Sequence, residues 1–296
     1  MIGDARELLP YGSDVSDRRA WLELRRTGVT ASEAGVILGL SRWSSPTALW
    51  FQKRGELDDE IENDQMRLGK VLEPYVLQRF SEMTGITRLE YAGLLQNQER
   101  RWQLCTPDAL ARSLDTGDPY PIEAKTAVSE DQWGKSGVAD IPLAYRCQIL
   151  WQMDVIGAPV GYLCVLFLRS GEPRWYQVEW DAEDVGVMRA AALEFLDYLE
   201  RGELPPTDAS EATQKALRAM YRSDDDVPDA VCGPGLLRSY RAALKAYSAA
   251  EDRKRLASNK IRVAMGNSAR LRGPDGEIVA SKRGPNDSLY PGKNLK

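Results

Sequence analysis

The feature that most constrains the fold is a change of hydrophobic periodicity near residue 86. Before it, the stretch from Met66 to Met83 carries apolar side chains at roughly helical spacing, and Gly85 follows as a typical helix end. After it, the segments GLLQN, WQLCTPDAL and YPIEAKTAV have the composition of short strands, with a turn at TGDP. The chain therefore needs both helices and a sheet to bury its apolar residues.

The order of the remaining elements predicts an α/β fold. Helices are expected around residues 31–40, 46–54, 142–156 and 181–201, and the runs VGYLCVLFL and RWYQVEW are expected to be strands. Pro74 lies inside the helix 66–83 and should kink or locally open it. Strands and helices in this order favour a mixed sheet that helices cover on both faces, with the functional site at the edge of the sheet.

A domain boundary is predicted at Leu204-Pro205-Pro206. Residues 1–204 form the expected core. Residues 205–296 form a helical C-terminal extension that ends in a hairpin pattern centred on Pro274-Asp275-Gly276. The long helix expected at about 235–265 is rich in lysine and arginine, and two interpretations of it stay open. It is either an arm that contacts DNA phosphates, or a solvated helix that docks on the core through Leu237, Tyr240, Leu244 and Tyr247.

The absence of histidine restricts the chemistry that the chain can perform. With no histidine among 296 residues, Ser-His-Asp and Cys-His hydrolases, HExxH metalloproteases and histidine-dependent nucleases are excluded. The four cysteines are widely spaced and show no CxxC pairing, so a structural zinc site is not expected. Catalysis would have to use carboxylates, amides, hydroxyls, lysine or arginine. An oxygen-only ligand set suits hard cations such as Mg²⁺ or Mn²⁺.

Composition also bears on where the protein acts. Hydrophobic residues make up 43% of the chain and charged residues 28%, as in ordinary globular proteins. No apolar run approaches the roughly 20 residues that span a bilayer, and the first residues lack a signal-peptide layout. We therefore expect a cytosolic protein that makes no membrane contact. The net charge of −5 argues mildly against nonspecific nucleic-acid binding, although a local basic groove matters more than the total.

Three residues form the candidate catalytic set. Asp108 belongs to one short predicted strand, and Glu123 and Lys125 lie two residues apart on the next, so alternation puts both on the same face. If the strands pair as a hairpin, Asp108 lies beside Glu123, and the two carboxylates with the Ala124 carbonyl can hold one divalent cation. Taken alone, these three residues fit a solvated strand face as well, so the surrounding sequence decides between the two interpretations.

The surrounding sequence contains a series of ordered motifs. They are WLELRRTGVTAS at 21–32, GKVLEP at 69–74, TPDAL at 106–110, EAK at 123–125 and YRCQILWQM at 145–153. The series resembles the phage-type exonucleases of the PD-(D/E)xK superfamily, which include the lambda exonuclease and YqaJ viral recombinase group. The resemblance covers roughly residues 17–200, and five motifs in order are far more specific than any one of them.

This resemblance implies a restriction-endonuclease-like core and assigns roles around the catalytic set. Glu73 would complete the metal site, together with Asp108, Glu123 and Ala124, or would orient a water. Gln148 would orient a water or a phosphate. The same helix would direct further polar side chains at the substrate, namely Tyr145 and Gln152.

The resemblance also implies a region that reads the end of a DNA strand. Arg26 and Ser32 would contact phosphate there, but the segment between them is one residue shorter than in the lambda form, so Arg25 is the alternative to Arg26. Two other departures from the family pattern are a longer connection between Asp108 and Glu123, and an alanine in place of the usual glycine after Asp108. Neither removes a ligand. Apart from the resemblance, Trp133 in a polar loop is a candidate wedge against a DNA end.

The implied activity is Mg²⁺-dependent hydrolysis of DNA, with Mn²⁺ as a substitute, running 5′ to 3′ on linear duplexes in phage-type recombination or end processing. A homotrimer around DNA and a single-strand annealing partner are implied by the same resemblance. Two alternatives stay open. One is an endonuclease or structure-specific nuclease with the same site. The other, of a different class, is a catalytically silent DNA-binding or scaffold protein, which the complete set of Asp108, Glu123 and Lys125 disfavours.

Overall fold

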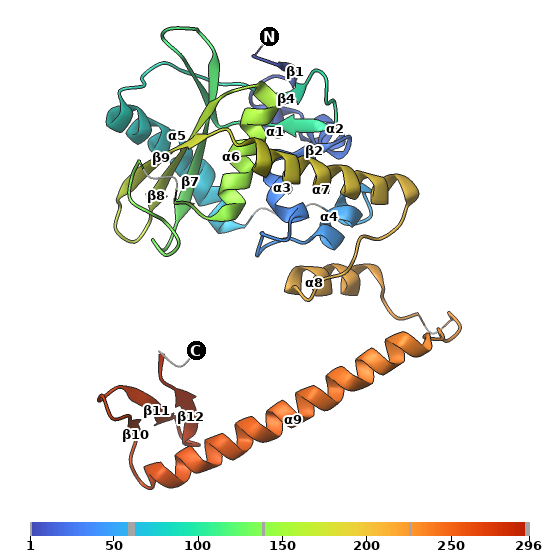
Figure 1. Ribbon diagram of the computed structural model, residues 1–296, viewed down its shortest axis with the longest axis vertical. Coiled ribbons are helices and arrows are strands. Elements are labelled where there is room, and N and C mark those ends of the chain that lie inside the picture. Colours follow the sequence, from blue (N-terminus) through green and yellow to red (C-terminus); the bar gives the residue numbers. More distant parts are fainter. Residues whose placement is uncertain (1, 59–62, 138–139, 225, 294–296) are drawn as a thin grey trace. The chain divides into compact units, whose positions relative to one another are not determined.

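The computed structural model describes residues 2–58, 63–137, 140–224 and 226–293 and divides the chain into two compact units, Met1–Ser223 and Asp224–Lys296 (Figure 1). The sequence placed the end of the core at residue 204. The division falls later because helix α8 (Glu211–Met220) packs on α4 (Pro46–Lys53) and buries Thr213 and Ala216 in the first unit. The proline pair therefore lies between two helices of the same unit and does not end the domain.

The central element of the first unit is a five-stranded mixed sheet in the order β3-β6-β7-β8-β9. Its strands are β3 (Leu89–Glu90), β6 (Ala109–Arg112), β7 (Pro119–Ala127), β8 (Val160–Phe167) and β9 (Pro173–Glu179). The β7–β8 pair is parallel and the other pairs are antiparallel. This arrangement confirms the mixed sheet flanked by helices, although Glu123 lies on β7, the middle strand, and not at the edge of the sheet.

Helices cover both faces of this sheet. On one face, α5 (Asp64–Thr84) packs Val76, Leu77 and Phe80 against Ile122 and other small apolar strand residues. On the other face, α6 (Leu143–Ile156) buries its apolar residues in the larger core. Because side chains alternate along a strand, β7 directs Ile122 toward α5 and Glu123 toward α6. The two helices thus fix the surroundings of each strand residue.

A second, four-stranded sheet was not expected. It runs β1-β4-β5-β2, with β1 (Ala5–Leu9), β4 (Leu94–Asn97), β5 (Gln103–Cys105) and the short β2 (Val29–Thr30). The sequence predicted helices before residue 86 and, after it, one mixed sheet for the core. The two N-terminal strands escaped detection because β2 has only two residues and β1 lacks a clear alternation. Both are held by partners far along the chain, β4 and β5.

Most predicted helices are confirmed. Besides α4 and α5, the structure contains α1 (Ser13–Ser16), α2 (Arg18–Arg26), α3 (Ala31–Ile37) and α7 (Ala182–Arg201). Thr30 and Glu33 form the expected capping box, and Gly85 ends α5 in a left-handed conformation. Pro74 lies within α5, which is assigned without interruption from Asp64 to Thr84. In the part of the chain that is described, no helix is both long and apolar enough to cross a membrane.

The second unit consists of α9 (Pro234–Met265) and a three-stranded antiparallel sheet. The expected hairpin is present as β10 (Arg270–Arg272) and β11 (Ile278–Arg283), and β12 (Ser288–Pro291) extends it. Met265 and Ala280 are the buried apolar residues of this unit, and Lys282 donates a hydrogen bond to the Gly266 carbonyl. Leu237, Tyr240, Leu244 and Tyr247 are not covered by the elements of their own unit.

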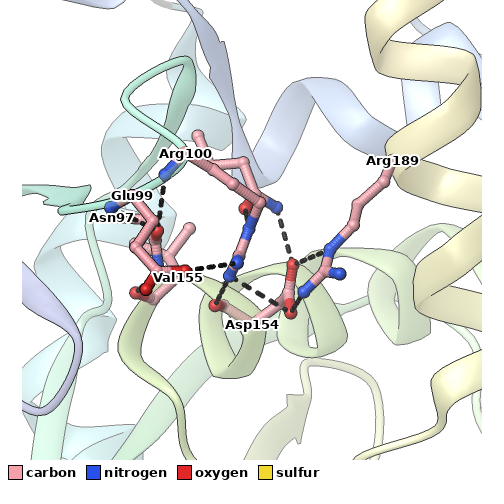
Figure 2. Close-up of polar contacts among 7 residues, drawn as sticks. Asn97, Glu99, Arg100, Asp154, Val155 and Arg189 are labelled. Carbon is pink, nitrogen blue, oxygen red and sulfur yellow. Dashed lines mark hydrogen bonds and ion pairs between the residues drawn. The ribbon is translucent and has the colours of Figure 1, made fainter.

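A buried carboxylate ties α6 to its neighbours. Asp154, 4% exposed, accepts hydrogen bonds from Gln103 Nε2 at 2.7 Å and from Arg189 Nε at 2.8 Å, and Arg100 lies 3.7 Å away (Figure 2). Asn97 extends the network by donating to the Val155 carbonyl at 2.9 Å. The network joins the last turn of α6 to α7 and to the β4–β5 turn, so it fixes the helix that faces Glu123.

We expect Asp154→Ala to lower the free energy of unfolding by about 3–5 kcal/mol, because it leaves buried donors and two arginines without their shared acceptor. Urea unfolding followed by circular dichroism measures the effect. Asp197→Ala is the matched control, because Asp197 pairs with Arg201 on the surface, where such pairs contribute about 0–1 kcal/mol. Equal losses in the two variants would contradict the assigned role of Asp154.

Candidate active site

Asp108 occupies the point where β6 separates from the central strand. Ala109 pairs with Ile122 in the antiparallel ladder, and beyond that pair Asp108 Oδ2 accepts a hydrogen bond of 2.7 Å from the backbone N–H of Ala124. The carboxylate thus takes the place of a missing ladder partner. The expected proximity of Asp108 to Glu123 is observed.

Glu123 is 2% exposed and uses both of its oxygens. Oε1 accepts hydrogen bonds from Lys125 and from Gln148 Nε2 (2.5 Å), and Oε2 accepts one from Gln152 Nε2 (2.6 Å). The two glutamines lie four residues apart on α6, one turn from each other, so a single helix face holds the carboxylate. Gln152 is fully buried. It is therefore placed to orient Glu123, whereas the sequence assigned it to substrate contact.

Lys125 lies between Glu123 and an aromatic ring. Its ammonium forms an ion pair with Glu123 and sits 5.5 Å from the centre of the Tyr145 ring. Burial opposes the charged form, but the charges of Glu123 and Asp108 outweigh it and raise the pKa of Lys125. Lys125 is therefore a permanent cation. Tyr145 in turn stacks on Trp133 at 5.4 Å, and Trp133 also packs against Phe167 and Tyr176, so this tryptophan is not free to wedge against DNA.

Negative charge accumulates around these residues. Burial, followed by the charges of Glu123 and Glu73, raises the pKa of Asp108 well above its usual range. Burial and then the charge of Glu123 also raise the pKa of Glu73, which lies on α5. The site therefore combines three carboxylates with Lys125, and Lys70 lies near Glu73; an added cation would relieve the mutual repulsion of the carboxylates.

The donor set fits a hard divalent cation. Carboxylates of Asp108, Glu123 and Glu73 and the carbonyl of Ala124 offer only oxygen, as Mg²⁺ and Mn²⁺ prefer. As the side chains stand, no three acidic or sulfur-bearing residues of the described ranges converge tightly enough to hold an ion. The reason is visible in the hydrogen bonds, because Glu123 turns both oxygens toward Lys125, Gln148 and Gln152. A bound cation would have to share or displace those contacts.

A second polar cluster lies where α2 meets α3. Arg25 Nη2 lies 3.4 Å from Ser32 Oγ and 3.4 Å from Glu33 Oε1, and its guanidinium stacks over Trp21 at 4.4 Å. Arg26 is exposed, and its Nη1 lies near Gly55. The sequence indicated Arg26 or Arg25 as the residue that contacts phosphate together with Ser32. In the structure it is Arg25 that lies beside Ser32. The helix α3 packs on α6, so the cluster and the carboxylates flank one helix.

Lys53 holds this cluster and was missed by the sequence. Its side chain is 3% exposed and donates to the carbonyls of Arg25 and Gly28, both at 2.6 Å, while Nζ lies 2.7 Å from Glu33 Oε2. Burial alone would raise the pKa of Glu33, but the charges of Lys53 and Arg25 lower it. The one available signal was a lysine at the end of the apolar helix α4, whose neighbours Trp50 and Phe51 are buried.

The fold and site together define the class of protein. The chain has a mixed α/β fold that is similar to the fold of the exonuclease LHK-Exo in two solved structures. The structure of LHK-Exo in complex with dAMP matches with a TM-score of 0.51 and 21% identity, covering 68% of this chain and 96% of that chain. The structure of the alkaline exonuclease LHK-Exo from Laribacter hongkongensis matches with a TM-score of 0.50 and 22% identity, covering 62% of this chain and 93% of that chain. At these identities the likeness concerns the fold.

The sequence comparisons give the family. Residues 20–159 match the family model described as the YqaJ-like viral recombinase domain. The curated protein described as "Uncharacterized protein YqaJ", from Bacillus subtilis (strain 168), is 28% identical over 232 residues, which are 76% of this chain and 70% of that protein. Residues 20–159 are thus similar to the YqaJ-like viral recombinase domain, and this match confirms the resemblance noted in the sequence. The matched segment contains every candidate site residue.

Proposed function

We propose that the protein is a metal-dependent DNA exonuclease that hydrolyses phosphodiesters at Asp108, Glu123 and Lys125. The observation that carries the proposal is the meeting of these three residues, two from one strand and one from the end of its neighbour, on a helix face that supplies Gln148 and Gln152. The structural neighbour LHK-Exo is an alkaline exonuclease, and its likeness in fold supports the same activity.

Each residue has a role that its contacts support. Asp108, Glu123, Glu73 and the Ala124 carbonyl would hold the divalent cation, Mg²⁺ with Mn²⁺ as a substitute. When bound, such a cation makes water a better nucleophile and offsets the charge that develops on the phosphate. Lys125, a permanent cation beside Glu123, stabilises negative charge on the phosphate oxygens. Gln148 and Gln152 keep the Glu123 carboxylate in place, so that the site is organised before substrate arrives.

The Arg25–Ser32 cluster would bind the terminal 5′-phosphate. Arg25 presents a planar donor fork that its Trp21 stack and its contact with Glu33 hold in one orientation, and the Ser32 hydroxyl lies exposed beside it. This pairing favours degradation from the 5′ end. A homotrimer around DNA and a single-strand annealing partner remain proposals on the family resemblance alone.

One experiment tests cleavage and its polarity. Wild-type protein is incubated with Mg²⁺ and three DNAs: a linear duplex with 5′-phosphates, the same duplex without them, and a closed circle. We expect loss of the phosphorylated linear duplex first, and no cleavage after addition of a chelator. Cleavage of the circle would make the protein an endonuclease. No cleavage with either Mg²⁺ or Mn²⁺ would favour the silent DNA-binding alternative.

We further propose that the second unit adds nonspecific affinity for DNA. Residues 234–296 contain fourteen lysines and arginines against five aspartates and glutamates, although the whole chain is acidic. At 3.6 residues per turn, five exposed basic side chains of α9 project within about 60° of one line along the helix. They are Arg238, Arg241, Lys245, Arg253 and Lys260. A stripe of this length and charge complements a duplex backbone.

Replacement of these five residues with glutamine should make the salt dependence of duplex binding less steep. If all five contact phosphates, the slope of log Kobs against log salt concentration should change by about 4.5, because each neutralised phosphate contributes about 0.9. Fluorescence anisotropy with a labelled 30-base-pair duplex, at several salt concentrations, measures it. An unchanged slope in a variant that retains the wild-type melting temperature would leave α9 as a solvated helix.

A further inference from the structure

Two tyrosines form an exposed aromatic pair that neither hydrophobic core uses. The rings of Tyr11 and Tyr91 are 4.9 Å apart between centroids and tilted by 37°. Tyr11 is 58% exposed and Tyr91 is 50% exposed, and neither packs against the two core clusters. Aromatic side chains this open contribute little apolar burial to folding, and these two leave their ring faces accessible to a ligand.

The chain brings Tyr91 to the catalytic carboxylates through β3. Glu90, the last residue of β3, pairs with Leu110 of β6 in an antiparallel ladder. Tyr91 follows Glu90, so it lies at the end of β6 that begins with Ala109. Asp108 directly precedes that end.

Tyr11 reaches the same place by an independent route. It follows β1 by two residues, and the chain there passes so close to Gly93 that a Cβ on this glycine would lie 2.0 Å from the Leu9 carbonyl oxygen. Only glycine permits this crossing, which brings Tyr11 to Tyr91. Three residues further on, Asp14 lies 3.8 Å from Lys70, which precedes Glu73 by one helical turn of α5. The pair therefore lies beside both Asp108 and Glu73.

The electrostatics agree with this position. Burial, followed by the charge of Glu73, raises the pKa of the Tyr11 hydroxyl, and Asp14 and Asp108 add to the effect. The surroundings of the pair are thus acidic and polar, which disfavours docking of an apolar protein surface. These surroundings suit a flat, uncharged ring. The charged part of such a ligand would lie away from the tyrosines, at a cation held by the carboxylates.

We propose that Tyr11 and Tyr91 form a stacking subsite for a nucleobase next to the phosphodiester that is cleaved. The inference rests on the proposed nuclease function and adds to it the position of one base. Every base has a π-face, so a stacking pair holds the strand without selecting sequence. The tyrosines touch no reacting atom: they position the nucleotide whose phosphate lies at Asp108 and Glu123.

The test compares alanine and phenylalanine variants of both tyrosines on normal and abasic DNA. Stacking on one base accounts for about a 5- to 150-fold effect, so Tyr11→Ala and Tyr91→Ala should each lower kcat/KM on a normal linear duplex by a factor in that range. Tyr11→Phe and Tyr91→Phe keep the π-face and should stay within about twofold of wild type. Trp180→Ala is the matched control. Trp180 is an aromatic residue that is 41% exposed, and it follows β9, the edge strand opposite β3 in the five-stranded sheet.

Abasic DNA separates stacking from a merely structural role. A series of duplexes carries one abasic residue at successive positions from the end. Wild type should cleave one of these duplexes more slowly than normal DNA, because the missing base is the one that stacks. The alanine variants should cleave that duplex and normal DNA at the same rate. Alanine variants that cut normal DNA as wild type does, or that lose equally on both DNAs at every position, would overturn the proposal.

Binding gives a second measurement that does not need cleavage. In a Glu123→Gln background, anisotropy should show weaker binding to a labelled oligonucleotide with the abasic residue than to the normal one. Adding Tyr11→Ala should remove this difference in affinity. If the wild-type protein cuts no DNA but this difference persists, the nuclease proposal fails and the stacking subsite stands. If binding is equal on both DNAs, the stacking subsite fails.

Discussion

Glu123→Gln is expected to reduce hydrolysis of a linear duplex by at least about 10³-fold, as loss of a central catalytic group does in other hydrolases. Glu123 is the residue on which the site converges, since Lys125, Gln148 and Gln152 all donate to its two oxygens. The substitution keeps the shape of the side chain and removes its charge. It therefore removes a proposed ligand of the cation and the partner that orients Lys125, while the strand and helix around it stay in place.

Single-turnover cleavage with saturating Mg²⁺ measures this loss, and duplex binding by anisotropy should stay within about threefold of wild type. Glu183→Gln serves as the control, because Glu183 is exposed in the first turn of α7. Folding is checked separately, because Glu123 is buried and its replacement leaves Lys125 without its ion-pair partner. Circular dichroism should show that the variant is folded at the assay temperature. A cleavage rate within tenfold of wild type would remove Glu123 from the catalytic set.

Arg25→Ala is expected to lower the preference for 5′-phosphorylated over unphosphorylated duplex ends by about 10- to 100-fold, the range for a hydrogen bond to a charged group. The adjacent Arg26 is the internal control, because the two residues have the same chemistry and differ in where the structure directs them. Arg25 lies beside Ser32, and Arg26 lies near Gly55. Arg26→Ala should change the preference by less than about threefold.

The ratio of the two kcat/KM values, measured on both DNAs by each variant, separates end recognition from a general loss of activity. Glu33 keeps its ion pair with Lys53 in Arg25→Ala, so the fold around the cluster should persist. If Arg26→Ala abolished the preference and Arg25→Ala did not, Arg26 would be the phosphate contact despite the shorter segment, and the proposed end-reading pair would be wrong.

Local patterns made much of the fold predictable. The caps of α3 and α4 and the glycine ends of α5 and α6 depend on residues a few positions apart, and the structure has these helices close to the predicted bounds. The same holds for the site on β7. Strand alternation puts Glu123 and Lys125 on one face, and a short hairpin brings Asp108 beside them.

The rest of the molecule depends on segments that are distant in the sequence. The second sheet joins β1 to β4 and β2 to β5 across more than sixty residues, so no local pattern announces it. Packing of α8 on α4 moved the end of the first unit from residue 204 to Ser223. Lys53 is buried where α2 ends and donates to the carbonyls of Arg25 and Gly28. In this arrangement Arg25, and not Arg26, lies beside Ser32.

The sequence by itself therefore determined the resemblance to the family, the α/β class and the catalytic candidates, because each depends on residue types at short, regular spacing. Only the tertiary structure decided that Gln152 faces Glu123, that Trp133 is packed internally, and that Tyr11 meets Tyr91 beside Asp108. The physical reason is the same in each case. A side chain's neighbours depend on how several distant elements pack at once, and a helix or strand pattern specifies only which of its faces is turned inward.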